Sequence, residues 1–273
     1  MSLAPPHTPS MVAPVERIEG DFARSLLLLC DHASNATPTE YGNLGMPPAE
    51  CERHIAYDIG AAAVTWACAR ALGVPALLTT FSRLLIDPNR GLDDPTLIVR
   101  VSDGTLVPGN AHLNPAEVER RIKRFYEPYN AAIATALDAF VGAGVVPMIL
   151  SVHSMTDRMQ GIARPWHASV LWDADPRLAQ ALLLALRREP DLAVGDNEPY
   201  GDALRGDTLD RHAAPRGLAA AVLELRQDLV AREDEAAAWG RRLAHLVEPI
   251  LDDPALRVPQ HYPSRAGVVT SKT

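Results

Sequence analysis

Two histidines of this 273-residue chain lie at the ends of short apolar runs. The run 26–29 leads into His32, and the run 145–150 leads into His153. Such runs predict buried strands, and ligands of open α/β sheets gather beyond the carboxyl ends of the strands. Neutral imidazole binds zinc, cobalt or iron, and two such ligands with a carboxylate leave one position for water. The pair therefore indicates a metal site. The alternative is that each histidine caps a strand or is a hydrogen-bonded core residue.

A second group of polar residues surrounds the short apolar stretch 84–86. An arginine guanidinium binds a carboxylate through two parallel hydrogen bonds, and a neighbouring asparagine amide adds another. Asp87 would orient the arginine. The pattern predicts a carboxylate-binding site, and the alternative is a solvated loop with a surface ion pair. The polar members of the group are Arg83, Asp87, Asn89 and Arg90.

Glu224 lies inside the apolar run 218–225, which predicts another buried strand. An unpaired carboxylate in such a place costs free energy, so it must be protonated, paired or bound to a metal. Burial raises the pKa of a carboxyl group, and this suits a general base that takes a proton from water. The alternative is a structural glutamate paired with Arg226 or another arginine.

The elements that position these residues alternate between short apolar runs and longer helical patterns, which is typical of an α/β fold. Further strands are predicted at 76–80 and 168–172. Helices are predicted at 48–72, 115–140, 175–188 and 232–251, the second of them kinked or broken at Pro128.

No repeat or low-complexity linker divides the sequence. We therefore expect a single domain over 16–258, with a central, mostly parallel or mixed sheet flanked by helices. The termini 1–15 and 259–273 are expected to be loose.

The composition excludes several classes of partner. A formal net charge of -8 argues against nucleic acid and anionic membranes, because both are bound through clustered Lys and Arg. The longest apolar run near the N-terminus, 26–30, is too short to span a bilayer or to form a signal core. Cys30, Cys51 and Cys68 form no CxxC pair, so we expect reduced thiols and a cytoplasmic protein.

Six motifs occur in the order found in the N-formylglutamate amidohydrolase family, and they span residues 26–229. They are CDHASN, RHIAYDIGA, SRLLIDPNR, SVHSM, DNEPY and HAAPRGLAAAVLELRQDL. The sequence thus resembles that family, which is similar to carboxypeptidase-like (phosphorylase/hydrolase-like) zinc hydrolases. The resemblance implies metal-dependent hydrolysis of an N-acyl amino acid, first of all N-formyl-L-glutamate. The alternatives are another N-acyl amino acid or short peptide, or an acidic small molecule that is bound without turnover.

The resemblance also implies roles for individual residues. His32 and His153 match the metal-binding histidines, and Glu224 matches the catalytic glutamate of a late strand. Arg83 is expected to stabilise the oxyanion. The expected substrate-binding residues are Asp87, Asn89, Arg90, Asn197, Tyr200 and His212.

One position departs from the pattern of the larger group, which places a glutamate three residues after the first histidine. Asn35 stands there, and asparagine is a poor zinc ligand. We therefore expect Asp58 as the third ligand, although His54 lies one turn earlier on the predicted helix and the two could form a structural pair. The implied cofactor is a divalent metal, zinc before cobalt or iron, and the implied partner is a small acidic N-acyl amino acid.

Overall fold

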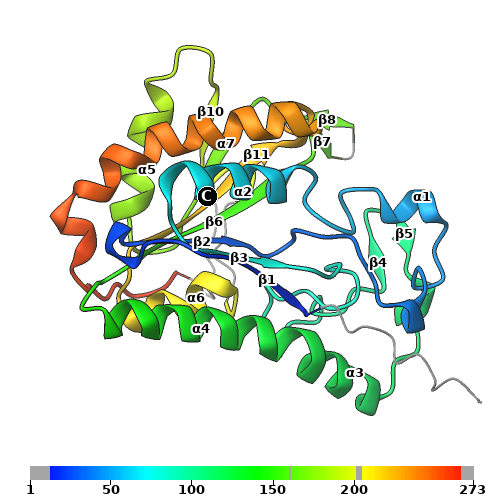
Figure 1. The fold of residues 1–273 in the computed structure, drawn as a ribbon. Helices are drawn as coiled ribbons and strands as arrows, with labels where there is room; N and C mark the ends of the chain where they lie inside the picture. Colours follow the sequence, from blue (N-terminus) through cyan, green and yellow to red (C-terminus); the bar gives the residue numbers. More distant parts are fainter. Residues whose placement is uncertain (1–12, 160, 201–204, 266–273) are drawn as a thin grey trace, which may run out of the picture.

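A computed structural model describes residues 13–159, 161–200 and 205–265. Within these ranges a seven-stranded sheet runs through the centre, in the order β1-β3-β2-β6-β11-β9-β10 (Figure 1). Its strands are β1 (Val15–Ile18), β2 (Leu26–Cys30), β3 (Ala76–Thr79), β6 (Met148–Met155), β9 (Ala168–Leu171), β10 (Val194–Asp196) and β11 (Ala220–Arg226). Two short hairpins lie outside it, namely β4 (Val101–Ser102) with β5 (Thr105–Leu106), and β7 (Arg158–Met159) with β8 (Ile162–Ala163).

The sheet is mixed. Strands β3, β2, β6 and β11 are parallel neighbours, whereas β1 and β9 run antiparallel to β3 and β11. Strand β2 is apolar and buried at every position, as expected for a parallel strand that is covered on both faces. The predicted α/β class with a central mixed sheet is confirmed.

Helices cover the two faces of the sheet (Figure 1). Alternate residues of a strand point to opposite faces, so Leu26 and Leu28 pack under one helical layer and Leu27 and Leu29 under the other. The first layer consists of α2 (Ala61–Leu72), α5 (Arg177–Arg187) and α7 (Glu233–Val247). The second layer contains α4 (Glu127–Gly142) and α6 (Thr208–His212), and α3 (Pro115–Arg121) leads into α4.

The prediction of a single helix over 48–72 was wrong. The structure has a short α1 (Pro48–Cys51), and α2 begins only after Gly60. Gly60 has φ 81°, and a Cβ atom there would lie 2.1 Å from the carbonyl oxygen of Val230. The intervening segment is held to the sheet, because the Asp58 amide donates to the His32 carbonyl at 2.9 Å. Tertiary contacts therefore override the helical pattern and bring Asp58 to the end of β2.

The helix predicted over 115–140 is not broken at Pro128. A π-helical turn at Ile122–Tyr126 links α3 to α4, and Pro128 lies in the first turn of α4. Proline has no amide hydrogen and so cannot continue regular α-helical hydrogen bonding, and the π-helical turn directly before it is the place where the α pattern is interrupted. The last helix ends earlier than predicted, at Val247, and continues as the 3-10 turn Glu248–Asp252.

Three further expectations about the fold needed correction. Strand β6 extends to Met155, so His153 lies inside the strand and not beyond it. Strands β1 and β10 were not predicted, and β1 begins within the expected N-terminal arm. Within the expected C-terminal tail, the Gln260 amide donates to the Gly217 carbonyl at 2.8 Å. Across the described part of the chain, none of the helices combines the length and apolar character that a membrane span requires.

Candidate active site

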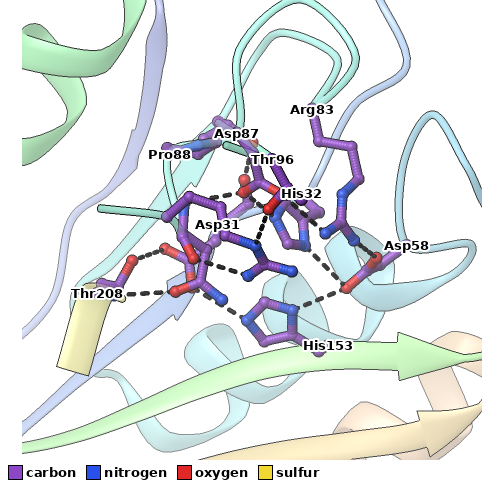
Figure 2. A network of polar contacts seen from close by, with 12 residues as sticks. Asp31, His32, Asp58, Arg83, Asp87, Pro88, Thr96, His153 and Thr208 are labelled. Atoms are coloured by element: carbon purple, nitrogen blue, oxygen red, sulfur yellow. Dashed lines mark hydrogen bonds and ion pairs between the residues drawn. The ribbon is translucent and has the colours of Figure 1, made fainter. Parts of the chain in front are cut away.

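Two imidazole rings and one carboxylate meet beside the ends of β2 and β6, on the face of the sheet that carries α4 and α6 (Figure 2). The Nδ1 atom of His153 lies 2.8 Å from Asp58 Oδ2, and Nδ1 of His32 lies 3.4 Å from the same oxygen. All three side chains are buried. Their potential ligand atoms lie within 4.8 Å of one another, so the structure brings the three predicted metal ligands together.

A second carboxylate stands behind each ring. Asp87 Oδ1 lies 2.8 Å from Nε2 of His32, and Asp31 Oδ2 lies 3.0 Å from Nε2 of His153. Metal-binding histidines usually donate their other ring N–H to a carboxylate, which sets the tautomer and increases the basicity of the free nitrogen. In this arrangement both Nδ1 atoms face the space beside Asp58, where a cation would be held.

Asp31 is the centre of a buried hydrogen-bond network. Its carboxylate accepts from Ser151 Oγ at 2.6 Å, from Tyr129 Oη at 2.9 Å and from Thr208 Oγ1 at 2.9 Å. Burial opposes its ionisation, but the hydrogen bond and charge of His153 lower the pKa of Asp31 to about 2. Asp31 was not predicted as a site residue, although its place directly after a buried strand and before His32 can be recognised in the sequence.

The donor set fits a divalent metal. Two neutral imidazoles with one carboxylate suit zinc, cobalt or iron and leave a position for water or substrate. Burial opposes ionisation of Asp58, but the nearby histidines outweigh it and keep its pKa below the usual range. Asn35 takes no part in the cluster, because its side-chain amide donates to the Cys51 carbonyl at 3.0 Å.

Arg83 lies at the edge of the cluster. Its Nη2 atom is 2.7 Å from Asp87 Oδ2, and its Nη1 atom is 3.5 Å from Asp58 Oδ1. The following apolar stretch 84–86 is buried in a core cluster of its own and anchors this segment. The predicted link between Asp87 and Arg83 is therefore present, and it holds the guanidinium beside the proposed metal ligands.

Glu224 approaches the cluster from the next strand. It pairs with His153 in the parallel register of β11 and β6, so both side chains lie on the same face of the sheet. Burial raises the pKa of Glu224 to about 7, against the opposing charge of His153. Its Oε2 atom is buried and has no hydrogen-bond partner in the described part of the chain. The predicted alternative, a pair with Arg226, is absent there, because that guanidinium is bound to Asp228 at 2.7 Å.

These groups open into a cavity of about 580 Å³. Arg83, Asn89, Arg90, Asn197 and Tyr200 all line it. The Asn89 Oδ1 atom accepts from the Thr208 amide at 2.9 Å, and the Arg90 Nη1 atom donates to the Asn89 carbonyl at 2.9 Å. Asn197 Oδ1 accepts from the Trp172 amide at 2.8 Å, and Tyr200 Oη accepts from Arg164 at 2.9 Å.

Two predicted substrate-binding residues stand away from this lining. Asp87 lies behind His32, and His212 is bound to Asn130 Oδ1 at 2.7 Å through Nε2. Burial, together with the charge of Arg211, lowers the pKa of His212 to about 4, so its ring is neutral near pH 7. His54 does not pair with Asp58 but lies 3.5 Å from Asp103, because the predicted helix over both residues is interrupted.

Comparisons with known protein families and solved structures agree with the fold and with the resemblance noted in the sequence. Residues 24–231 match the family described as N-formylglutamate amidohydrolase. A gene product from Agrobacterium tumefaciens has a similar crystal structure, with 32% identity, a TM-score of 0.79 and coverage of 88% of this chain and 95% of that one. N-formylglutamate amidohydrolase from Ralstonia eutropha shows 23% identity and a TM-score of 0.65, with coverage of 88% and 98%. A metallo-carboxypeptidase from Pseudomonas aeruginosa shows 11% identity and a TM-score of 0.44, with coverage of 87% and 60%. No curated protein matches the sequence.

The family match defines the class of this protein as a hydrolase that acts on an amide. The family match covers most of the chain, from the start of β2 to the end of the β11 region. The chain belongs to the N-formylglutamate amidohydrolase family. The resemblance noted in the sequence is thereby confirmed.

Proposed function

We propose that this protein hydrolyses the amide bond of N-acyl amino acids with the help of a divalent metal, zinc in the first place. The observation that carries the proposal is the buried carboxylate of Glu224, which has a raised pKa and stands beside His153. His32, His153 and Asp58 would hold the metal. A metal bound there would polarise the acyl oxygen and lower the pKa of water.

Glu224 and Arg83 have different roles in the proposed reaction. Glu224 takes the proton from the attacking water, because its carboxylate is half ionised near pH 7. Arg83 donates hydrogen bonds to the oxygen that gains negative charge when water adds to the acyl carbon. Glu224 then delivers the proton to the leaving amino group, so the amide yields a free acid and a free amino acid.

Arg90 and Asn89 are the proposed clamp for the substrate carboxylate. Both line the cavity, and the Asn89 oxygen is already bound to Thr208, so its amide NH₂ is the part that faces a ligand. A guanidinium and an amide together fix a carboxylate and place the scissile bond near Glu224. Asn197 and Tyr200 are proposed to border the bound substrate, whereas Asp87 and His212 are proposed to position His32 and Asn130.

A deacylation screen tests the function. Protein loaded with zinc or cobalt is given N-formyl, N-acetyl and longer N-acyl amino acids, N-formylglutamate among them, and the released free amine is quantified. Turnover that is lost in Glu224→Gln and retained in the exposed control Glu233→Gln supports the proposal. Stoichiometric metal without turnover of any N-acyl amino acid would contradict it.

A further inference from the structure

The cavity next to Glu224 is lined by apolar residues, by carboxylates and by two arginines. From this we infer a substrate preference: N-acyl amino acids with one carboxylate and one large apolar group are better substrates than the dicarboxylate N-formylglutamate. The inference rests on the proposed function and narrows its substrate.

The first observation is the small number of cations. Among the described residues that line the cavity, Arg83 and Arg90 are the arginines, and lysine does not occur. Arg83 is held by Asp58 and Asp87, close to the proposed metal ligands. Arg90, whose contact with Asp94 is long at 4.0 Å, is therefore the one guanidinium that remains for a substrate carboxylate. A second carboxylate on the substrate would enter the cavity without a cationic partner, and that is costly in a buried site.

The second observation is that carboxylates line the cavity and add no spare positive charge to it. Asp175 is paired with Arg177 at 2.6 Å, and Asp173 lies 3.5 Å from Arg265. Their charges are therefore balanced by arginines that do not line the cavity, and they add no net positive charge to it. A second substrate carboxylate would therefore meet no spare positive charge at these two positions. The acidic residues that line the cavity besides Asp58 and Glu224 are Asp173, Asp175, Asp207 and Asp210.

The third observation is an apolar wall directly beside the proposed base. Val222 precedes Glu224 by two residues, so both side chains project from the same face of β11. Leu171 of β9 pairs with Val222 across the antiparallel register, and Ala220 continues the row along the strand. All three line the cavity. Leu209 of α6, with Ala213 and Leu218 of the segment after it, lines the same cavity.

The wall has room for a large group. A cavity of about 580 Å³ lies within the range of roughly 300–1,000 Å³ that is typical of sites for drug-sized ligands. A formyl group on a short polar amino acid would leave the surface of Val222 and Leu171 in contact with water. An apolar group on the substrate would cover that surface, and this apolar group is carried by either the acyl chain or the amino-acid side chain.

Matched substrate pairs test this substrate preference. They also show whether the acyl chain or the amino-acid side chain carries the apolar group. N-formylmethionine and N-formylglutamate share the acyl group and have side chains of similar length, but they differ in charge. N-hexanoylglycine and N-formylglycine share the amino acid and differ in acyl length. We expect kcat/KM of the metal-loaded enzyme to be at least about tenfold higher for the apolar member of one pair. A gain in the first pair places the apolar group on the amino acid, and a gain in the second places it on the acyl chain.

Equal or faster hydrolysis of N-formylglutamate than of N-formylmethionine, together with no gain from the hexanoyl chain, would overturn the inference and leave the proposed function intact. No turnover of any of the four compounds would overturn both.

A charge placed on the wall provides a second test. Val222→Lys should lower kcat/KM for the apolar substrate and raise it for N-formylglutamate, so that their ratio falls by about tenfold or more. Leu171→Lys at the paired position is the second variant if Val222→Lys does not fold, as judged by circular dichroism. The control is Val141→Lys on the outer side of α4, where the side chain is 67% exposed and the ratio should not change. An unchanged ratio in both folded wall variants would overturn the inference.

Discussion

Glu224 and His153 lie directly opposite each other on the parallel strands β11 and β6. Side chains in such a pair project to the same face of the sheet, so the proposed base stands next to a proposed metal ligand without help from any loop. Sites built on strands are held more rigidly than sites on loops. The relationship therefore fixes the distance between the two groups.

The first prediction concerns the metal. His32→Ala and His153→Ala should each lose bound metal and activity while keeping the fold, because each removes one of three ligands. Elemental analysis of protein purified without chelators measures the metal, and circular dichroism measures the fold. His245→Ala, an exposed histidine of α7, is the control and should keep full metal content. Full metal occupancy in either ligand variant would refute the assignment.

The second prediction concerns the two carboxylates behind the histidines. Asp31→Asn and Asp87→Asn should weaken metal binding by about 10- to 100-fold without removing a ligand, because each carboxylate orients one imidazole ring. Competition with a metal chelator gives the affinity. Asp138→Asn on the exposed side of α4 is the matched control. Wild-type affinity in both variants would show that the carboxylates do not act on the metal site.

The third prediction separates substrate binding from chemistry. Arg90→Ala should raise KM strongly for an N-acyl amino acid and far less for the corresponding amino-acid amide, which lacks the carboxylate. Steady-state kinetics on the two compounds measures the difference. Equal losses on both would show that Arg90 supports the structure or acts in the transition state.

The fourth prediction concerns catalysis by Glu224. Glu224→Gln keeps the shape of the side chain but cannot accept a proton, so kcat should fall by about 10²–10⁴-fold while metal content and KM change little. In the wild type, kcat/KM should decline as the pH falls below about 7, because the carboxyl group is then protonated and cannot act as a base. A stable, metal-replete variant with normal kcat would exclude Glu224 as the base.

The fifth prediction concerns stability and pH. The pKa of Glu224 in the folded protein, about 7, lies above its ordinary value of 4.5, so burial favours the protonated form. The contribution of this group to stability is fully present below pH 4.5 and is lost as the pH rises through 7.

Glu224→Gln stays neutral at every pH and should therefore gain stability relative to the wild type between pH 5 and 8. The gain should be no more than about 3 kcal/mol, as the difference between the two pKa values implies. Melting temperatures of the metal-free proteins across this range measure the effect. A structural ion pair of Glu224 would give the opposite sign, with the variant less stable at pH 8.

Much of the fold followed from local patterns. The runs that became β2, β3, β9 and β11 are apolar because both faces of a central strand are covered, and this is visible in the sequence. The edge strands β1 and β10 were missed because a strand at the edge is short and partly polar. The break between α1 and α2 was missed because it depends on contacts of Gly60 and Asp58 with segments distant in the sequence.

In the candidate site, too, some features follow from local sequence patterns and others depend on contacts between distant segments. By itself, the sequence singled out His32, His153 and Glu224 as candidates, because a histidine after an apolar run or a glutamate within one is unusual and can be recognised locally. Their arrangement was decided by tertiary structure alone. Asp58 rather than Asn35 reaches the histidines, because its segment hydrogen-bonds to His32 whereas the Asn35 amide is bound to Cys51. Asp31 and Asp87 orient imidazole rings from behind, and such a geometry depends on strand register and loop packing that no local pattern encodes.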